Sequence, residues 1–183
     1  MRALTTEQYK TIIQAMRSGY GSLRANPRCA AVLVAEANLG MRIGDIMRLK
    51  LSDIVRDGNR YRLNVTEEKT GKRRTFTVPE EIYNYFCDYA RKQHIGPDDR
   101  LFPITARAVQ KHLKDVCDAL GYEGISTHSF RKWYATDIYE RNGHDIVLVQ
   151  HLLQHSSAII TQRYIGISND KIEKAIAGHV MIA

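Results

Sequence analysis

The segment that most constrains the fold runs from Pro27 to Leu39 and is apolar on most of its sides. Asn26 is a favoured helix N-cap residue, and Pro27 after it suits the first helical position. Gly40 ends the segment, as glycine commonly does after the last helical residue. A helix that is apolar nearly all round belongs in the interior of a domain. We therefore expect this helix to be the central, buried one.

Other helix signals lie on both sides of this segment. A threonine followed three residues later by glutamate or glutamine forms a capping box, and Thr5 with Gln8 fits that pattern. Thr105 is a further N-cap candidate, and Gly121 closes the helix that it starts. Together these signals predict helices over residues 6–16, 79–93 and 105–120.

Residues 54–78 change to alternation between polar and apolar side chains. This period predicts strands at 60–65 and 73–78, with turns at Asp57-Gly58 and Thr70-Gly71. The charged side chains of this small antiparallel sheet are expected on one face. The fold class that follows is mainly helical α+β, with one small antiparallel sheet among the helices.

Composition narrows the class of protein. The 183 residues fit one domain, and no stretch approaches the ~18 apolar residues of a membrane span. The N-terminus lacks the apolar middle of a secretory signal. Cys29, Cys87 and Cys117 are odd in number and far apart, so they indicate buried thiols in a reducing, cytoplasmic compartment. The formal charge of 27 − 20 = +7 favours a polyanionic partner.

The segment 127–165 carries the side chains that point to a reaction. His128 and Arg131 are three residues apart, so on a helix they share a face with Cβ atoms about 5–6 Å apart. They converge there on one small anion, and a guanidinium forks two N–H bonds onto phosphate oxygens. His155 and Tyr164 follow. A phenol, whose ordinary pKa is about 10, becomes a nucleophile when cations and a histidine surround it.

This segment resembles the C-terminal signature of the tyrosine recombinases, the phage integrase family. That signature reads H-x-x-R, then L-L-G-H-S-S, then a tyrosine. The chain has its counterparts at 128–131, at 152–157 and at Tyr164. Gln154 stands where the family usually has glycine, a difference that removes no catalytic group.

A second resemblance lies directly after the central helix. The family's first box is a G-x-R sequence followed by an acidic residue and an apolar helix, and residues 40–46 match it with Arg42 and Asp45. Alone, the two would be a surface arginine beside a carboxylate. With the later motif, the resemblance implies that Arg42 is a catalytic arginine oriented by Asp45. The family also carries a lysine on a β-turn, which Lys69 matches best, with Lys72 as the alternative.

The resemblance implies the tyrosine recombinase (DNA breaking-rejoining enzyme) fold and a site-specific recombinase or integrase. Such an enzyme joins DNA to its tyrosine as a 3′-phosphotyrosine and exchanges strands through a Holliday junction. The two arginines and His155 would stabilise charge on the phosphate oxygens. Lys69 would protonate the leaving 5′-oxygen, and His128 would assist at the tyrosine or support the phosphate. The implied catalytic residues are Arg42, Lys69, His128, Arg131, His155 and Tyr164.

Double-stranded DNA is the partner that the resemblance implies. The candidate DNA contacts are cationic side chains on the sheet and on the helix at 105–120, namely Lys72, Arg73, Arg107, Lys111, His112 and Lys114. In the family the C-terminal tail docks on a neighbouring protomer of a tetrameric synapse. The tail here has an expected helix at 169–177, which folds back on its own chain in the alternative interpretation.

The resemblance covers only the catalytic part of the family, so residues 1–183 are interpreted as a single catalytic domain without the N-terminal core-binding domain. We expect a fragment of a longer protein, with a stand-alone member as the alternative. Its source is expected to be prokaryotic or a phage, as part of a mobile genetic element. Two other functions stay open at this point. One is a type IB-like topoisomerase, which religates the original ends, and the other is a non-catalytic DNA-binding protein.

No metal or other cofactor is expected, because two arginines and a lysine supply the positive charge. His144, His151 and His155 include an i, i+4 pair, a spacing that suits zinc. No cysteine or acidic ligand accompanies them, and His151 is expected on a helix surface. Trp133 and Tyr134 lie within the helix of Arg131 and are expected to pack in the core or orient that arginine.

Overall fold

The computed structural model describes residues 4–66, 68, 69, 71, 73–153, 155 and 157–165. At positions 74, 158, 163 and 164 it describes the backbone alone. The chain divides into two compact units, Met1–Tyr134 and Ala135–Ala183. Each unit is described by itself below.

The central helix of the first unit is α2 (Pro27–Leu39), as the sequence predicts. Its N-cap is Asn26, whose Oδ1 accepts a hydrogen bond from the backbone N–H of Cys29 at 3.1 Å. It contacts α1 (Thr6–Ser18), α3 (Ile43–Ile46), α4 (Glu80–Gln93) and α5 (Ala106–Ala119).

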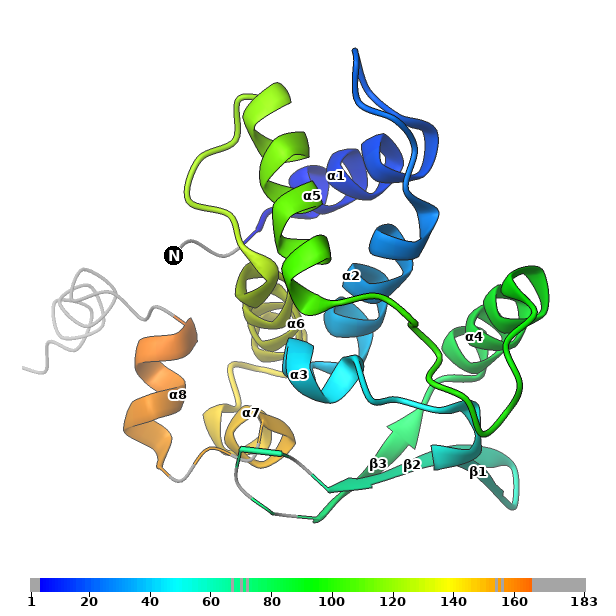
Figure 1. Cartoon of the computed structure of the whole chain (residues 1–183). Coiled ribbons are helices and arrows are strands. Elements are labelled where there is room, and N and C mark those ends of the chain that lie inside the picture. Colours follow the sequence, from blue (N-terminus) through cyan, green and yellow to red (C-terminus); the bar gives the residue numbers. More distant parts are fainter. Residues whose placement is uncertain are drawn as a thin grey trace, which may run out of the picture. The chain divides into compact units, whose positions relative to one another are not determined.

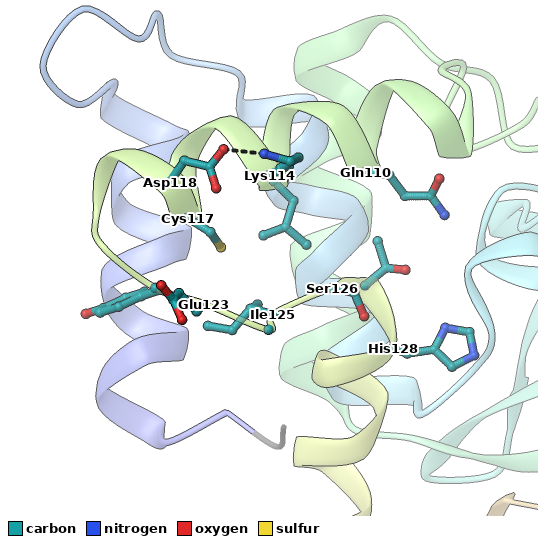
Figure 2. A pocket seen from close by; sticks show the side chains of 12 residues that line it. Gln110, Lys114, Cys117, Asp118, Glu123, Ile125, Ser126 and His128 are labelled. Carbon is teal, nitrogen blue, oxygen red and sulfur yellow. Dashed lines mark hydrogen bonds and ion pairs between the residues drawn. The ribbon is translucent and has the colours of Figure 1, made fainter. Parts of the chain in front are cut away.

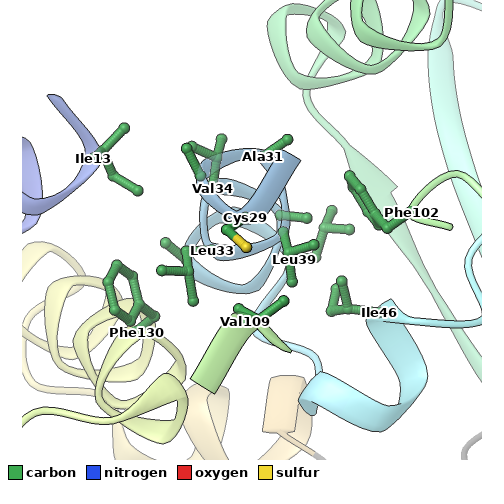
Figure 3. Packing of buried hydrophobic residues seen from close by; sticks show 14 of the residues in the cluster. Ile13, Cys29, Ala31, Leu33, Val34, Leu39, Ile46, Phe102, Val109 and Phe130 are labelled. Atoms are coloured by element: carbon green, nitrogen blue, oxygen red, sulfur yellow. The ribbon is translucent and has the colours of Figure 1, made fainter. Parts of the chain in front are cut away.

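Figure 3 shows the packing around α2, where side chains from several other elements converge on its surface. Leu33 on α2 has no exposed surface, and neither do Ile46, Val109 and Phe130 from three other helices. Burying one such side chain contributes about 1.5–3 kcal/mol. The helices of this unit therefore pack around α2 because it is apolar on most of its sides.

The N-caps of two more helices are confirmed. Thr5 Oγ1 accepts from the backbone N–H of Gln8 at 3.1 Å, and the Gln8 side chain accepts from Thr5 N at 3.0 Å, which completes the capping box of α1. Thr105 Oγ1 accepts from Ala108 N at 3.2 Å and starts α5. Helices α1, α2, α4 and α5 begin and end within about two residues of the predicted limits.

A three-stranded antiparallel sheet follows α3 and a short 3-10 helix, η1 (Leu51–Asp53). Its order is β1 (Ile54–Asp57), β2 (Arg60–Thr66), β3 (Arg73–Val78). Leu63 on β2 pairs with Ile54 and Phe76 and is fully buried.

Successive residues of a strand point to opposite faces, so Arg60 and Arg62 lie on the face opposite Leu63. Asp57 Oδ2 accepts from Arg62 at 3.2 Å and from Arg60 at 3.4 Å. Tyr61, on the same face as Leu63, stacks on Tyr83 of α4 with ring centroids 3.9 Å apart. The predicted charged face of the sheet is confirmed.

Helix α6 (Thr127–Arg141) starts in the first unit and ends in the second. The second unit continues with α7 (Ile146–Leu153) and α8 (Ala158–Ile165), which pack on each other. The tail helix expected at 169–177 lies outside the described residues.

Two of the three thiols are buried as expected, those of Cys29 and Cys117, but Cys87 is half-buried. Cys87 occupies the partly exposed side of α4, and the core side of that helix is formed by Phe86, Tyr89 and Ala90. Among the described residues, no helix has the length and apolarity needed to cross a bilayer.

Candidate active site

Two predicted site residues, Arg42 and Asp45, lie in the turn after α2 and in the short helix that follows it. Gly40 adopts the left-handed conformation with φ of 56°, and its backbone N–H donates to Glu36 O at 3.0 Å. The chain then turns into α3, with Arg42 as the half-buried N-cap residue and Asp45 buried inside that helix. The first box therefore folds as a tight helix-to-helix connection at the C-terminal end of α2.

Arg131 reaches this turn from α6. Its side chain is almost fully buried, with 2% relative exposure, and Nη1 donates to the backbone carbonyl oxygen of Gly40 at 2.6 Å. The ring of Tyr134, one turn along α6, packs against the same glycine, and a Cβ placed there would overlap two carbons of that ring. Gly40 is thus required both by its backbone conformation and by the close approach of Tyr134.

Asp45 connects the first box to the turn after β2. Its Oδ1 accepts from the backbone N–H of Glu68 at 3.0 Å and from Arg48 Nη2 at 3.1 Å. Arg48 also lies 3.7 Å from Glu68 Oε1. The buried carboxylate therefore holds the backbone immediately before Lys69, which is itself exposed. The orientation of Arg42 by Asp45 stays a prediction, and Lys72 lies outside the described residues.

His128 lies at the start of α6, and its pKa depends on the charges near it. The pKa of its imidazole is lowered, first by partial burial and then by the positive charges of Arg131, Arg42 and Lys69. The ring is nevertheless at the surface. The charges of three cations, from the α2–α3 turn, the β2–β3 connection and α6, therefore act on one imidazole. Four of the six predicted residues come together in the first unit.

The other two predicted residues belong to the second unit. His155 follows α7, and its Nδ1 lies 3.0 Å from the hydroxyl of Thr161, a fully buried residue on α8. Gln150 Nε2 donates to the backbone carbonyl of His155 at 3.3 Å, and His155 N donates to Gln150 O at 3.1 Å. Tyr164 lies in α8, where the structure describes its backbone alone.

Three of the four predicted cationic residues of α5 are exposed, and their contact with DNA stays a prediction. Arg107, Lys111 and Lys114 are exposed, and Lys114 is paired with Asp118 at 2.5 Å. His112 is the exception: its Nε2 is buried without a hydrogen-bond partner in the described structure, and burial lowers its pKa. His112 fails to join the cationic face because it lies three residues after the core residue Val109 and shares its side of the helix. The sheet residue Arg73 is also exposed.

A cavity of about 600 Å³ lies between α5 and residues 122–128, and His128 is at one end of its lining. Figure 2 shows Gln110 and Lys114 on the α5 side and Ser126 beside His128. The imidazole of His128 therefore borders a cavity that is open to solvent.

The sequence matches the model of the phage integrase family over residues 2–171. The chain belongs to the phage integrase family. It is 34% identical over 158 residues to the probable integrase/recombinase YoeC of Bacillus subtilis (strain 168), covering 84% of this chain and 85% of that protein. It is 25% identical to the tyrosine recombinase XerA of Pyrococcus furiosus over 186 residues, which cover 96% of this chain and 60% of that protein.

Solved structures of phage integrase family members share the fold. The catalytic domain of bacteriophage HP1 integrase superposes with a TM-score of 0.67 at 19% identity, covering 97% of this chain and 94% of that one. The XerH site-specific recombinase bound to its difH substrate superposes with a TM-score of 0.72 at 20% identity, covering 96% of this chain and 54% of that one. The expected fold, mainly helical with a small antiparallel sheet, is confirmed.

Sequence reasoning missed two residues near predicted site residues, one in each unit. Thr161 fixes the ring of His155 through its hydroxyl. No local sequence pattern predicts this role for a threonine in a short helix. Glu36 is fully buried at the end of α2. It is the one acidic residue in a mainly apolar helix, and this was the signal in the sequence that could have identified it.

The remaining interpretations concern Trp133 and the histidines whose spacing suits zinc. Trp133 stacks on Tyr9 of α1, with centroids 4.8 Å apart and planes 3° from parallel, so the predicted packing role is confirmed. His144 Nε2 lies 2.9 Å from Glu140 Oε2, and His151 is exposed on α7 as expected. In the part of the chain that the structure describes, no group of three or more potential metal ligands occurs.

Proposed function

We propose that this chain cleaves and rejoins DNA strands as the catalytic domain of a site-specific tyrosine recombinase. The observation that carries the proposal is the hydrogen bond from Arg131 to the Gly40 carbonyl at 2.6 Å, because it joins the H-x-x-R motif to the turn of Arg42. The charges of Arg131, Arg42 and Lys69 also all act on the imidazole of His128. Three cations from separate parts of the chain are costly to bring together, because like charges repel. A phosphodiester supplies the negative charge that makes such a cluster favourable.

In the proposed reaction the hydroxyl of Tyr164 attacks the scissile phosphorus in line. The bond from phosphorus to the 5′-oxygen breaks, and a 3′-phosphotyrosine forms. The negative charge that grows on the non-bridging oxygens is stabilised by fixed donors, and such electrostatic stabilisation is usually the largest catalytic effect. Arg42 and Arg131 supply it, and His155 adds a hydrogen bond.

The leaving 5′-oxygen needs a proton, and Lys69 is the proposed general acid. His128 assists proton transfer at Tyr164 or supports the phosphate. Its lowered pKa keeps the ring neutral near pH 7, so it can accept a proton. Rejoining is the reverse, with a 5′-hydroxyl attacking the phosphotyrosine. The positive side chains take the place of a metal ion, so the proposed mechanism uses no cofactor.

Double-stranded DNA is the proposed partner. The formal charge of +7 favours it, and the exposed Arg73, Arg107, Lys111 and Lys114 offer phosphate contacts. XerH, which shares the fold, was solved bound to its difH DNA. We further propose Lys72 as a contact, and self-association of the chain on DNA into a tetrameric synapse through its C-terminal tail. A cytoplasmic, nucleoid-associated setting in a prokaryote or phage fits these roles.

A nicked suicide substrate tests the proposal, because loss of the short strand beyond the nick traps the covalent intermediate. The unsubstituted protein is expected to form a covalent protein–DNA adduct, and Tyr164→Phe is expected to form none. An adduct of equal yield with Tyr164→Phe would show that another residue is the nucleophile. DNA binding without any adduct in the unsubstituted protein would favour a non-catalytic DNA-binding role. Rejoining only of the original ends would favour a topoisomerase.

A further inference from the structure

Glu36 has an unusual environment for a carboxyl group. It lies in the last turn of α2 with 0% relative exposure, and both carboxyl oxygens lack a hydrogen-bond partner among the described residues. An unpaired buried carboxylate costs several kcal/mol. The negative end of the helix dipole, close to Glu36, adds to that cost. Both costs favour the neutral form of Glu36, and a nearby positive group opposes them.

Arg131 is the positive group next to it. The Gly40 carbonyl that accepts from Arg131 Nη1 at 2.6 Å belongs to the residue whose N–H donates to Glu36 O. The guanidinium therefore attaches to the same turn of α2 that carries Glu36, and both side chains are buried. Burial raises the pKa of Glu36 well above its ordinary value, and the charge of Arg131 opposes that rise.

Other titratable groups come from every element that packs on α2. They are Tyr9 on α1, Asp45 on α3, Tyr89 on α4 and His112 on α5. Arg131 on α6 is the charge, within the described chain, that acts on the pKa of Glu36. The protonation of Glu36 and the charge of Arg131 are consequently linked to each other more closely than to the rest of the core.

We propose that Glu36 is a positioning residue for Arg131, and that its carboxyl group takes up a proton from solvent when a DNA phosphate occupies the guanidinium. The inference rests on the proposed function, which places a phosphodiester on Arg131. Without DNA, the Gly40 carbonyl holds the guanidinium at the end of α2 through a hydrogen bond, and the buried carboxylate of Glu36 acts on it by its charge alone. A bound phosphate brings a second negative charge to the same guanidinium, and protonation of Glu36 removes the repulsion between the two anions.

Proton uptake is measured in the Tyr164→Phe background, where DNA binds without cleavage. One linked proton makes the affinity fall by up to about tenfold per pH unit as pH rises. Glu36→Gln keeps the shape of the side chain but cannot ionise, so it is expected to lose this part of the slope. Glu80→Gln, at an exposed position of α4, is the matched control and is expected to keep it. His128 titrates in all three proteins, so its contribution cancels in the comparison.

Equal slopes with Glu36 present and with the Glu36→Gln substitution would overturn the linkage. Calorimetry of DNA binding in two buffers of different ionisation enthalpy is a second measurement that needs no change to Glu36. It is expected to detect net proton uptake, and zero uptake between pH 6 and 8 would also overturn the proposal.

The positioning role is tested by a double-mutant cycle with Arg131→Lys on the nicked substrate. Glu36→Gln is expected to slow single-turnover cleavage about tenfold when Arg131 is present and less than about twofold in the Arg131→Lys background, because residues that act through one another are non-additive. Equal factors in the two backgrounds would overturn it. If the unsubstituted protein forms no adduct, the proposed function fails on its own. The same cycle then tests positioning through free energies of unfolding without DNA, where coupling supports it and additivity overturns it.

Discussion

Arg131 donates a 2.6 Å hydrogen bond to the backbone carbonyl oxygen of Gly40, and the two residues are 91 positions apart in the chain. This contact joins the second arginine of the proposed site to the turn that carries the first. A backbone acceptor cannot rotate away as a side chain can, so it fixes one arm of the guanidinium. In the proposed reaction, the remaining N–H groups of Arg131 are the ones available to the phosphate.

The first prediction concerns Arg131→Lys. Lysine keeps the positive charge but cannot form the fork of N–H bonds. Cleavage of the nicked substrate is expected to fall at least about 100-fold, as for loss of one oxyanion donor, and DNA affinity is expected to fall less than about threefold, because long-range attraction depends on charge alone. Single-turnover rates and binding isotherms measure the two quantities. A parallel loss of both would leave the transition-state role of Arg131 unsupported.

The second prediction concerns Gly40→Ala. A residue with a Cβ in the left-handed region costs about 1–2 kcal/mol, and here the added carbon would also overlap the Tyr134 ring. Urea unfolding should therefore show a larger loss than Gly121→Ala. Gly121 has φ of 71° and nothing within 4 Å of the point that a Cβ would occupy, so that variant carries the backbone cost alone. Equal losses in the two variants would mean that the Tyr134 contact is unimportant.

The third prediction distinguishes Asp45 and Lys69, which act at the leaving oxygen, from the arginines that donate hydrogen bonds to the phosphate. Asp45→Ala removes the acceptor of the Glu68 N–H and releases the backbone before Lys69. Asp45→Ala and Lys69→Ala are both expected to slow cleavage about 10²–10⁴-fold, the usual contribution of a general acid. A substrate with sulfur in place of the leaving 5′-oxygen should restore most of the rate, since a thiolate leaves without a proton. Arg131→Lys provides the control and should gain little from the sulfur.

The fourth prediction is a pH dependence. The folded protein holds the pKa of His128 below its ordinary value, so the unfolded chain binds more protons as pH falls below about 6.5. Stability is therefore complete above that pH and decreases as pH falls toward the folded pKa. His128→Gln should weaken this decrease in urea unfolding between pH 7.5 and 5. His112, also with a lowered pKa, should account for a further part through His112→Gln. An unchanged slope in both variants would contradict the prediction.

The fifth prediction concerns the exposed cations of α5. Arg107→Ala and Lys111→Ala should each reduce the slope of log K against log salt concentration by about 1, as expected for one lost phosphate contact. Lys114→Ala should change it less, because Asp118 already neutralises that ammonium group. Arg91→Ala on α4, where Arg91 is paired with Asp88, is the control without an expected change. Slopes unaffected by any α5 variant would place the DNA elsewhere.

Much of the fold was predictable because its signals are local. The N-caps at Thr5, Asn26 and Thr105 act within three residues, and all three hydrogen bonds are present. The alternation in 54–78 likewise reports which face of a strand is buried, and it correctly separated Leu63 from the arginines beside it. The orientation of His112 was wrong, because the helix carries both a core and a polar face and His112 falls near their boundary.

The site was predictable only in part. Residue types and order in the two motifs identified the candidates, but motif spacing says nothing about partners far along the chain. Asp45 holds a backbone group 23 residues away, and Glu36 shares a turn with the acceptor of Arg131. Neither contact has a local period that a sequence pattern could reveal.

The sequence by itself determined the helices, the small sheet, the integrase-family membership and the kinds of side chain available for reaction at a phosphate. Only the tertiary structure decided that Arg42, Lys69 and Arg131 act on one imidazole, and that the second arginine binds the end of the helix that carries the buried Glu36. The physical reason is the range of the forces involved. Caps and alternating faces are set by neighbours a few residues apart, whereas the gathering of charges depends on the packing of α2, α3, α6 and the sheet around a common core.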